Sequence, residues 1–163
     1  MTAEQLLNEF KENNSLSTAT IEYLDTDEKI GKELVFYFRK NKNRDLALHL
    51  LEKAIEIRSQ PYPNGYDMSG VILMLFSYIL GMHKNMEDCL KIWEAKTVDF
   101  DTFCLVDIQL VVFAGLEETI AFFKSQESDE SKDALKYVEE CKEAGDFENI
   151  ENYFSEVTVP WFV

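Results

Sequence analysis

Residues 68–82 contain no charged side chain, and their apolar residues fall on every side of the helix that they would form. A helix that is apolar all round must be buried all round. With a rise of about 1.5 Å per residue it would span roughly 22 Å, which is shorter than the roughly 30 Å hydrocarbon core of a bilayer. The run therefore predicts a central helix, capped by Asp67, that other helices enclose.

The composition favours helices around this central run. The chain has 163 residues, of which 46% are hydrophobic, so it is long enough to bury a sizeable core. It contains 6 glycines and 3 prolines, which is few for the many tight turns of a β sandwich. We therefore expect a single all-α domain over residues 1–163, built from stacked antiparallel helical hairpins as a superhelix or as an irregular bundle.

Apolar residues at helical spacing, together with capping residues, predict the other helices. Asp99 or Asp101 should cap a helix that ends near residue 114, and residues 157–163 should be extended. The remaining helices are expected around residues 6–10 and 21–24, from a cap at Asp27 to about 40, from the tight connection at 43–45 to about 58, and over 87–96, 116–125, 132–143 and 147–154.

Two of these segments resemble, in degenerate form, tetratricopeptide helical hairpin repeats. Residues 44–57 carry the small residues Ala47 and Ala54 seven positions apart, as in the second helix of that repeat. Residues 136–154 are similar to its turn, with Gly145 followed by an acid, an aromatic residue and an apolar stripe. The resemblance implies a stacked helical solenoid whose inner face grips a peptide or another protein.

The charge is strongly negative and unevenly distributed. The formal net charge is −15, and residues 97–163 contain 16 acids against 4 bases. Such a surface repels nucleic-acid phosphates and anionic lipids, so we expect neither nucleic acid nor membrane as a partner. It attracts a basic protein or peptide, although acidic charge that merely keeps the protein soluble is an equally open interpretation.

The compartment is inferred from the cysteines and the first residues. The chain contains 3 cysteines and no C-x-x-C pair. An odd number at low density argues against a disulfide framework and favours a reducing compartment. The opening residues MTAEQLLNEF lack the basic region and the apolar core of a signal peptide. We therefore expect a cytoplasmic protein.

Motifs for chemistry are scarce. Asp99 and Asp101 form a D-x-D pair, but they precede a helix, so capping explains them better than metal binding. His49 and His83 lack partners at metal-ligand spacing, and no phosphate-binding or nucleophile-elbow motif occurs. We therefore expect no metal, no cofactor and no catalytic residue.

Asp107 is unusual because its helical neighbours Cys104, Val111 and Ala114 are all apolar. A carboxylate on a covered face must be hydrogen-bonded or paired, or its pKa rises. Three interpretations remain open: an anchor bonded to a core Tyr, Ser or Trp, a groove residue that meets a partner's cation, and a catalytic acid or base.

The segment 160–163 carries Trp161 and Phe162, which either dock onto the last hairpin or present an anchor for a partner. Together these features predict a non-catalytic interaction module, an adaptor or an immunity-type inhibitor, that binds a basic protein or peptide. The alternative is an enzyme with a helical pocket that uses Asp107. The candidate binding residues are Asp99, Asp101, Asp107, Glu117, Glu118, Trp161 and Phe162.

Overall fold

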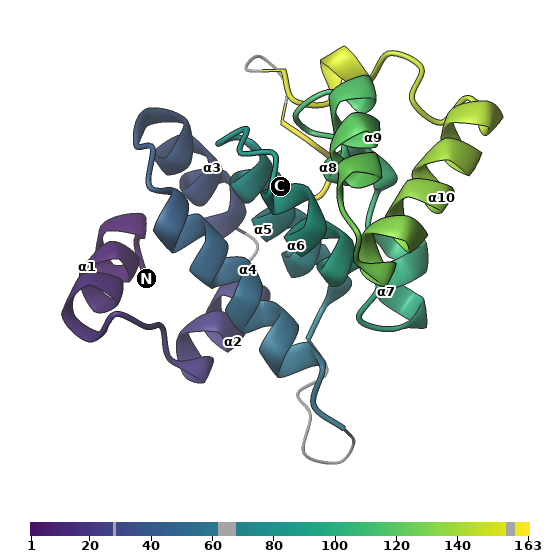
Figure 1. Ribbon diagram of the computed structural model, residues 1–163. Helices are drawn as coiled ribbons and strands as arrows, with labels where there is room; N and C mark the ends of the chain where they lie inside the picture. The colour runs from purple at the N-terminus through teal and green to yellow at the C-terminus, as the bar shows by residue number, and fades with distance from the viewer. Residues whose placement is uncertain (28, 62–67, 156–158) are drawn as a thin grey trace.

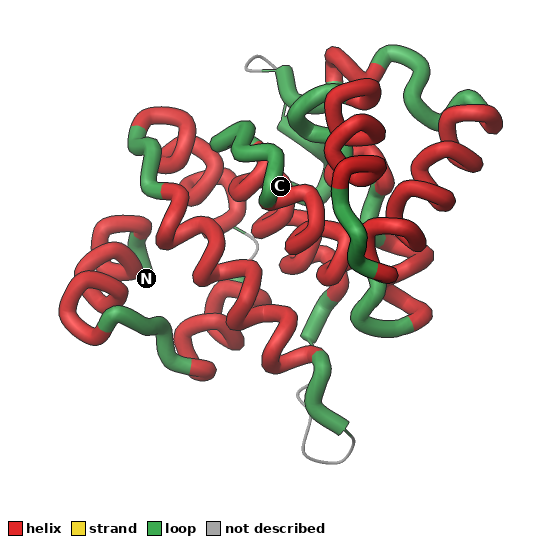
Figure 2. Tube along the Cα trace, in the orientation of Figure 1, coloured by secondary structure: helices red, strands yellow, loops and turns green. Residues whose placement is uncertain are grey.

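The computed structural model describes residues 1–27, 29–61, 68–155 and 159–163, and this part of the chain is helical with no strand (Figure 2). The predicted all-α class is confirmed. The helices are α1 (Ala3–Asn13), α2 (Thr18–Thr26), α3 (Ile30–Lys40), α4 (Arg44–Arg58), α5 (Gly70–Gly81), α6 (Asp88–Lys96), α7 (Phe100–Leu105), α8 (Ile108–Val111), α9 (Leu116–Ser125) and α10 (Asp129–Ala144), followed by a 3-10 turn, η1 (Ile150–Asn152).

Helix α5 occupies the centre of the molecule, as predicted. It packs against α3 and α4 on one side and against α6, α7 and α8 on the other (Figure 1). Eleven of its 12 residues are buried, including Leu73, Phe76 and Tyr78. The expected cap, Asp67, lies outside the described residues; the side chain of Ser69 caps the helix by accepting a hydrogen bond from the Val71 amide.

Caps fix where several other helices begin. Ser17, Asn43 and Ser128 each accept a hydrogen bond from a backbone amide in the first turn of α2, α4 and α10 respectively. The helix predicted over 132–143 therefore starts earlier, at Asp129. The prediction of Asp27 as the cap of α3 was wrong, because the residue before α3 is Lys29, which makes no side-chain cap hydrogen bond.

The single helix predicted to end near residue 114 is two short helices, α7 and α8. The ammonium of Lys96, at the end of α6, donates to the carbonyls of Phe103 at 2.5 Å and Val106 at 2.6 Å. Asp99 does cap α7, in a capping box with Thr102. Because Lys96 engages carbonyls that a continuous helix would use for its own hydrogen bonds, the chain bends between α7 and α8.

The prediction of a helix over 147–154 was also wrong. Gly145 ends α10 in the left-handed region with φ 88°, and Asn149 adopts the same region with φ 61°. A left-handed residue interrupts a right-handed helix, so only the turn η1 forms. None of the helices in the described ranges is long and apolar enough to span a bilayer.

We expect the burial of α5 to dominate stability. Leu73→Ala removes a fully buried side chain and leaves a cavity, which should lower the free energy of unfolding by about 2–5 kcal/mol in urea titrations. Val71→Ala, on the partly exposed first turn of the same helix, is the matched control and should cost less than about 1 kcal/mol. Equal losses for the two variants would contradict the central position of α5.

Candidate functional site

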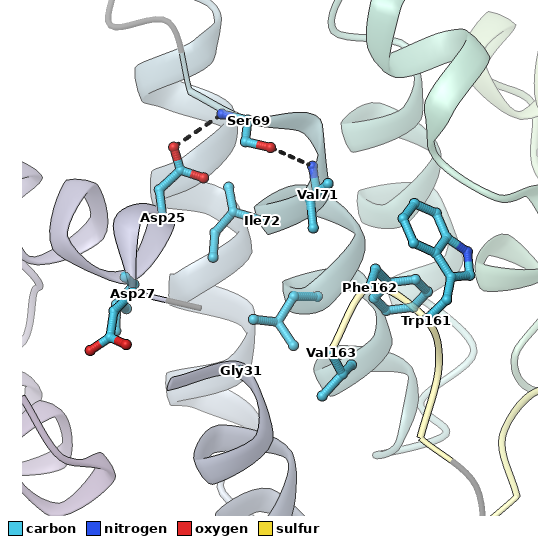
Figure 3. A pocket seen from close by; sticks show the side chains of 11 residues that line it. Asp25, Asp27, Gly31, Ser69, Val71, Ile72, Trp161, Phe162 and Val163 are labelled. Carbon is cyan, nitrogen blue, oxygen red and sulfur yellow. Dashed lines mark hydrogen bonds between the residues drawn. The ribbon is translucent and has the colours of Figure 1, made fainter. Parts of the chain in front are cut away.

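A cavity of about 450 Å³ opens beside the first turn of α5, between α2, α3 and the segment 159–163 (Figure 3). Its wall combines apolar residues of α5 with two carboxylates and an aromatic pair. The residues that line it are Leu24, Asp25, Asp27, Gly31, Ser69, Val71, Ile72, Leu75, Trp161, Phe162 and Val163. It is therefore built from segments that are far apart in the sequence.

The two aromatic residues of the C-terminal segment behave differently. Phe162 is 6% exposed and lies edge-on to the ring of Tyr78, with centroids 6.0 Å apart. Trp161 is 69% exposed, and its ring meets Phe162 edge-on at 5.7 Å. Phe162 is thus docked on the central helix, and this contact holds Trp161 at the rim of the cavity with its ring in solvent.

Asp25 supplies the carboxylate nearest the start of α5. One of its oxygens accepts a hydrogen bond from the Ser69 amide at 3.1 Å. Burial raises the pKa of Asp25, and this effect outweighs the lowering by that hydrogen bond and by the charge of Arg58. Sequence reasoning missed Asp25, because an acid within a short amphipathic helix has no pattern that separates it from a solvated one.

Asp27 marks the other side of the cavity. It accepts hydrogen bonds from the Tyr23 hydroxyl at 2.8 Å and from the Lys29 amide at 3.1 Å. These hydrogen bonds, the one from Tyr23 first, hold the pKa of Asp27 below its ordinary value. The cavity therefore carries one firmly ionised carboxylate and one whose charge is more easily lost on acidification.

Two of the predicted site residues lie close to this cavity. Arg58 donates from Nε to Asp99 at 2.7 Å and bonds the carbonyl of Met68, just before α5. Burial acts to raise the pKa of Asp99, but hydrogen bonds from Arg58 and Thr102 bring it below its ordinary value. Asp101 is exposed, 4.0 Å from the Arg58 guanidinium. The guanidinium thus meets more negative charge than it can neutralise.

Glu117 and Glu118 lie elsewhere, in the first turn of α9 on the opposite side of α5 from α1 (Figure 1). Glu117 pairs with Lys142 of α10 at 2.5 Å, and the last turn of α9 adds a pair between Lys124 and Glu139 at 2.9 Å. These pairs are exposed and contribute little to stability. They reduce the local negative charge that a partner would meet.

Asp107 borders a different cavity, of about 370 Å³, near the bend between α7 and α8. Its carboxylate accepts a hydrogen bond from the Tyr153 hydroxyl at 2.6 Å, which is the contact expected of an anchor. The helical spacing that made Asp107 look covered does not apply, because Asp107 is the residue before α8.

The same cavity contains Lys96, which sequence reasoning missed. Lys96 is 3% exposed, and its ammonium lies over the rings of Phe103 and Tyr137 at 4.9 and 5.5 Å. Burial lowers the pKa of Lys96, whereas the charges of Cys141, Asp107 and Cys104 oppose that shift.

In the part of the chain that is described, no three His, Cys, Asp or Glu side chains gather as metal ligands.

Comparisons with protein families, with curated proteins and with solved structures returned no match. The candidate sites are therefore the three surfaces defined by the protein's own contacts. One is the cavity of Asp25, Asp27 and Trp161 near the start of α5, with Asp99 and Asp101 beside Arg58. The second lies on α9 and α10, and the third surrounds Asp107 and Lys96.

We expect the hydrogen bond from Tyr153 to Asp107 to stabilise the fold in a pH-dependent way. Burial, and then the carboxylate of Asp107, raise the pKa of Tyr153 well above its ordinary value of 10.0. Tyr153→Phe should therefore lower the free energy of unfolding by about 1–2 kcal/mol at neutral pH. The difference from wild type should shrink above about pH 10, because the unfolded tyrosine ionises first.

Urea titrations of the wild type and of Tyr153→Phe at neutral and alkaline pH measure this difference directly. Other tyrosines and lysines titrate in both proteins, so their contributions cancel in the comparison. A variant as stable as the wild type at neutral pH would remove the anchoring role of this hydrogen bond.

Proposed function

We propose that this protein is a non-catalytic interaction module that binds a basic segment of another protein at the cavity beside the start of α5. The observation that carries the proposal is the position of Trp161, which is largely exposed although the neighbouring Phe162 is docked. A large exposed aromatic ring that shares a cavity with carboxylates on the other side is a suitable receptor for a segment with cationic side chains (Figure 3).

The expected contacts follow from the chemistry of the wall. A guanidinium or ammonium over the face of a tryptophan gains about 0.5–1 kcal/mol when exposed and about 2 kcal/mol when desolvated. The carboxylate of Asp25 is half-buried, so a cation that reaches it is less screened by solvent than one at an exposed acid. The apolar side chains of Val71 and Ile72 line the same cavity and match the methylene stem of arginine or lysine.

Long-range attraction supports the same function. Residues 97–163 hold four times as many acids as bases, and the chain as a whole carries −15. Such a field accelerates the approach of a basic partner, while the aromatic anchor sets the position in which it docks. An adaptor in a larger complex and an immunity-type inhibitor of a basic toxin domain, both in the cytoplasm, are two forms of this function.

The second candidate is an enzyme that uses Asp107. The observation that favours it is Lys96, an amine with a lowered pKa in the same cavity. We place it second because both groups already hold other parts of the structure: Asp107 binds Tyr153, and Lys96 binds two backbone carbonyls. Catalysis would require substrate to displace these contacts.

We expect Trp161→Ala to weaken binding of a hexa-arginine peptide by about fivefold to tenfold, as measured by titration calorimetry. Asp25→Asn should weaken it similarly, since the amide oxygen can still accept from the Ser69 amide while the charge is lost. Phe36→Ala is the matched control, because Phe36 is a 53% exposed aromatic of α3 outside the cavity wall.

The control variant should bind the peptide as the wild type does. If Trp161→Ala and Phe36→Ala bind with the same affinity as the wild type, the peptide recognises only the overall charge, and the proposed site is wrong.

The acidic α9 surface should act through the association rate. We expect the double substitution of Glu117→Lys and Glu118→Lys to slow association of the same peptide and to reduce its dependence on salt, with dissociation little changed. Glu4→Lys with Glu12→Lys on α1 makes the same charge change at exposed positions of the other half. Stopped-flow measurements over a range of salt concentrations compare the two. An unchanged salt dependence for the α9 variant would leave its acids with a solvating role only.

A further inference from the structure

A third cavity, of about 400 Å³, lies at the opposite end of α5 from the cavity that contains Asp25, and it has the opposite charge. It is formed where α3 and α5 end, and Phe154 closes one side. Arg39, Lys42, His83 and Lys84 line it, and among the described residues no carboxylate does. In a chain with a net charge of −15, a cavity lined by basic side chains requires a physical explanation.

Two of these cations have no counter-ion in the part of the chain that the structure describes. Among the described residues, neither Lys42 nor Lys84 forms an ion pair or a side-chain hydrogen bond. The nearby carboxylate of Asp88 binds the guanidinium of Arg44 through both of its oxygens, so it is already engaged. The cavity therefore retains a positive potential in the folded protein.

The backbone of Lys84 supports a functional position. Its φ of 54° lies in the left-handed region, where glycine or asparagine is usual and another residue costs about 1–2 kcal/mol. A glycine would adopt this backbone conformation at lower cost, but the position holds a lysine whose side chain lines the cavity. Strained backbone of this kind is concentrated at binding sites.

His83 adds an imidazole to the wall of the cavity. Its Nε2 is buried and has no hydrogen-bond partner among the described residues. Burial, and then the charge of Lys42, lower the pKa of His83, while Asp88 raises it and Arg44 lowers it. The ring is therefore mainly neutral, and a proton on Nε2 would have no acceptor. The proton belongs on Nδ1, where it can be donated to a ligand.

Two aromatic residues, Tyr78 and Phe154, form another part of the cavity wall. The rings of Tyr78 and Phe154 stack with centroids 5.2 Å apart and an interplanar angle of 10°. Arg39 donates a hydrogen bond to the Tyr78 hydroxyl at 3.3 Å and another to the carbonyl of Ser155 at 3.3 Å. The cavity is much larger than a phosphate ion and falls in the size range of sites for small organic ligands.

We infer that this cavity binds a small organic phosphate, with the phosphoryl group held by Lys42, Lys84 and Nδ1 of His83 and the organic part against Phe154. A phosphate monoester carries close to two negative charges at neutral pH and three acceptor oxygens, which matches two ammonium groups and one neutral donor. The site is independent of the surface proposed for a basic partner, so either proposal can fail without the other.

Titration calorimetry with phenyl phosphate, inorganic phosphate and phenol tests the inference, with the ionic strength held constant by sodium chloride. We expect phenyl phosphate to bind most tightly, inorganic phosphate more weakly and phenol not measurably. Lys42→Gln and Lys84→Gln should each weaken phenyl phosphate binding by about tenfold. Lys40→Gln is the matched control, because Lys40 is an exposed cation at the end of α3 that does not line the cavity.

The two histidines provide a spectroscopic readout within one sample. Phenyl phosphate should shift the imidazole NMR signals of His83. The signals of His49, whose Nε2 already accepts a hydrogen bond from the Leu16 amide at 3.0 Å, should stay unchanged. Equal affinity in the Lys42 and Lys40 variants, or equal shifts at both histidines, would overturn the inference. Because Lys42 and Lys84 are exposed, their substitution leaves the fold available for the test.

Discussion

The enclosure of α5 is the constraint on which the rest of the structure depends. Eleven of its residues are buried, so helices from both halves of the chain must cover it. Burying a leucine or phenylalanine side chain contributes about 1.5–3 kcal/mol, and α5 presents such residues on every face. Figure 1 shows α5 between α3 and α4 on one side and α6 and α8 on the other, so the burial of α5 helps to hold the two sides together.

The sequence predicted the elements well where one local signal decides them. The uncharged run of α5 and the cap of α7 at Asp99 each depend on residues close in the chain. The helix that splits into α7 and α8 could not be predicted, because the cause is Lys96 on a preceding helix. The periodicity of a segment carries no information about a side chain of another helix that donates hydrogen bonds to the carbonyls of that segment.

The candidate site was predictable only in part for the same reason. The sequence left open whether Trp161 and Phe162 dock or present an anchor, and their contacts show that Phe162 is docked and Trp161 is exposed. Asp25 gains its significance from Ser69 and from the C-terminal segment (Figure 3). Segments so distant in sequence are brought together by tertiary packing alone, and one sequence contains no record of that contact.

The two cavities at the ends of α5 share an electrostatic origin. A helix carries the equivalent of about +0.5 charge at its N-terminus and −0.5 at its C-terminus, and acids at the first and cations at the second are favoured. Asp25 hydrogen-bonds the Ser69 amide at the N-terminus, while Lys42 and Lys84 line the cavity at the C-terminus.

The helix dipole explains the charges at the N-terminus of α5 better than those at its C-terminus. At the N-terminus, Asp25 is the carboxylate that bonds the end of the helix, and Asp27 is engaged by Tyr23 and the Lys29 amide. The proposed docking role of this surface therefore depends on Trp161 rather than on unpaired charge. At the C-terminus, the permanent charges of Arg39, Lys42 and Lys84 exceed half a unit several times over. Arg39 is partly engaged by Tyr78 and Ser155, but the two lysines are not so engaged. The positive charge of these two lysines exceeds what the helix dipole requires, and a bound anion would neutralise it.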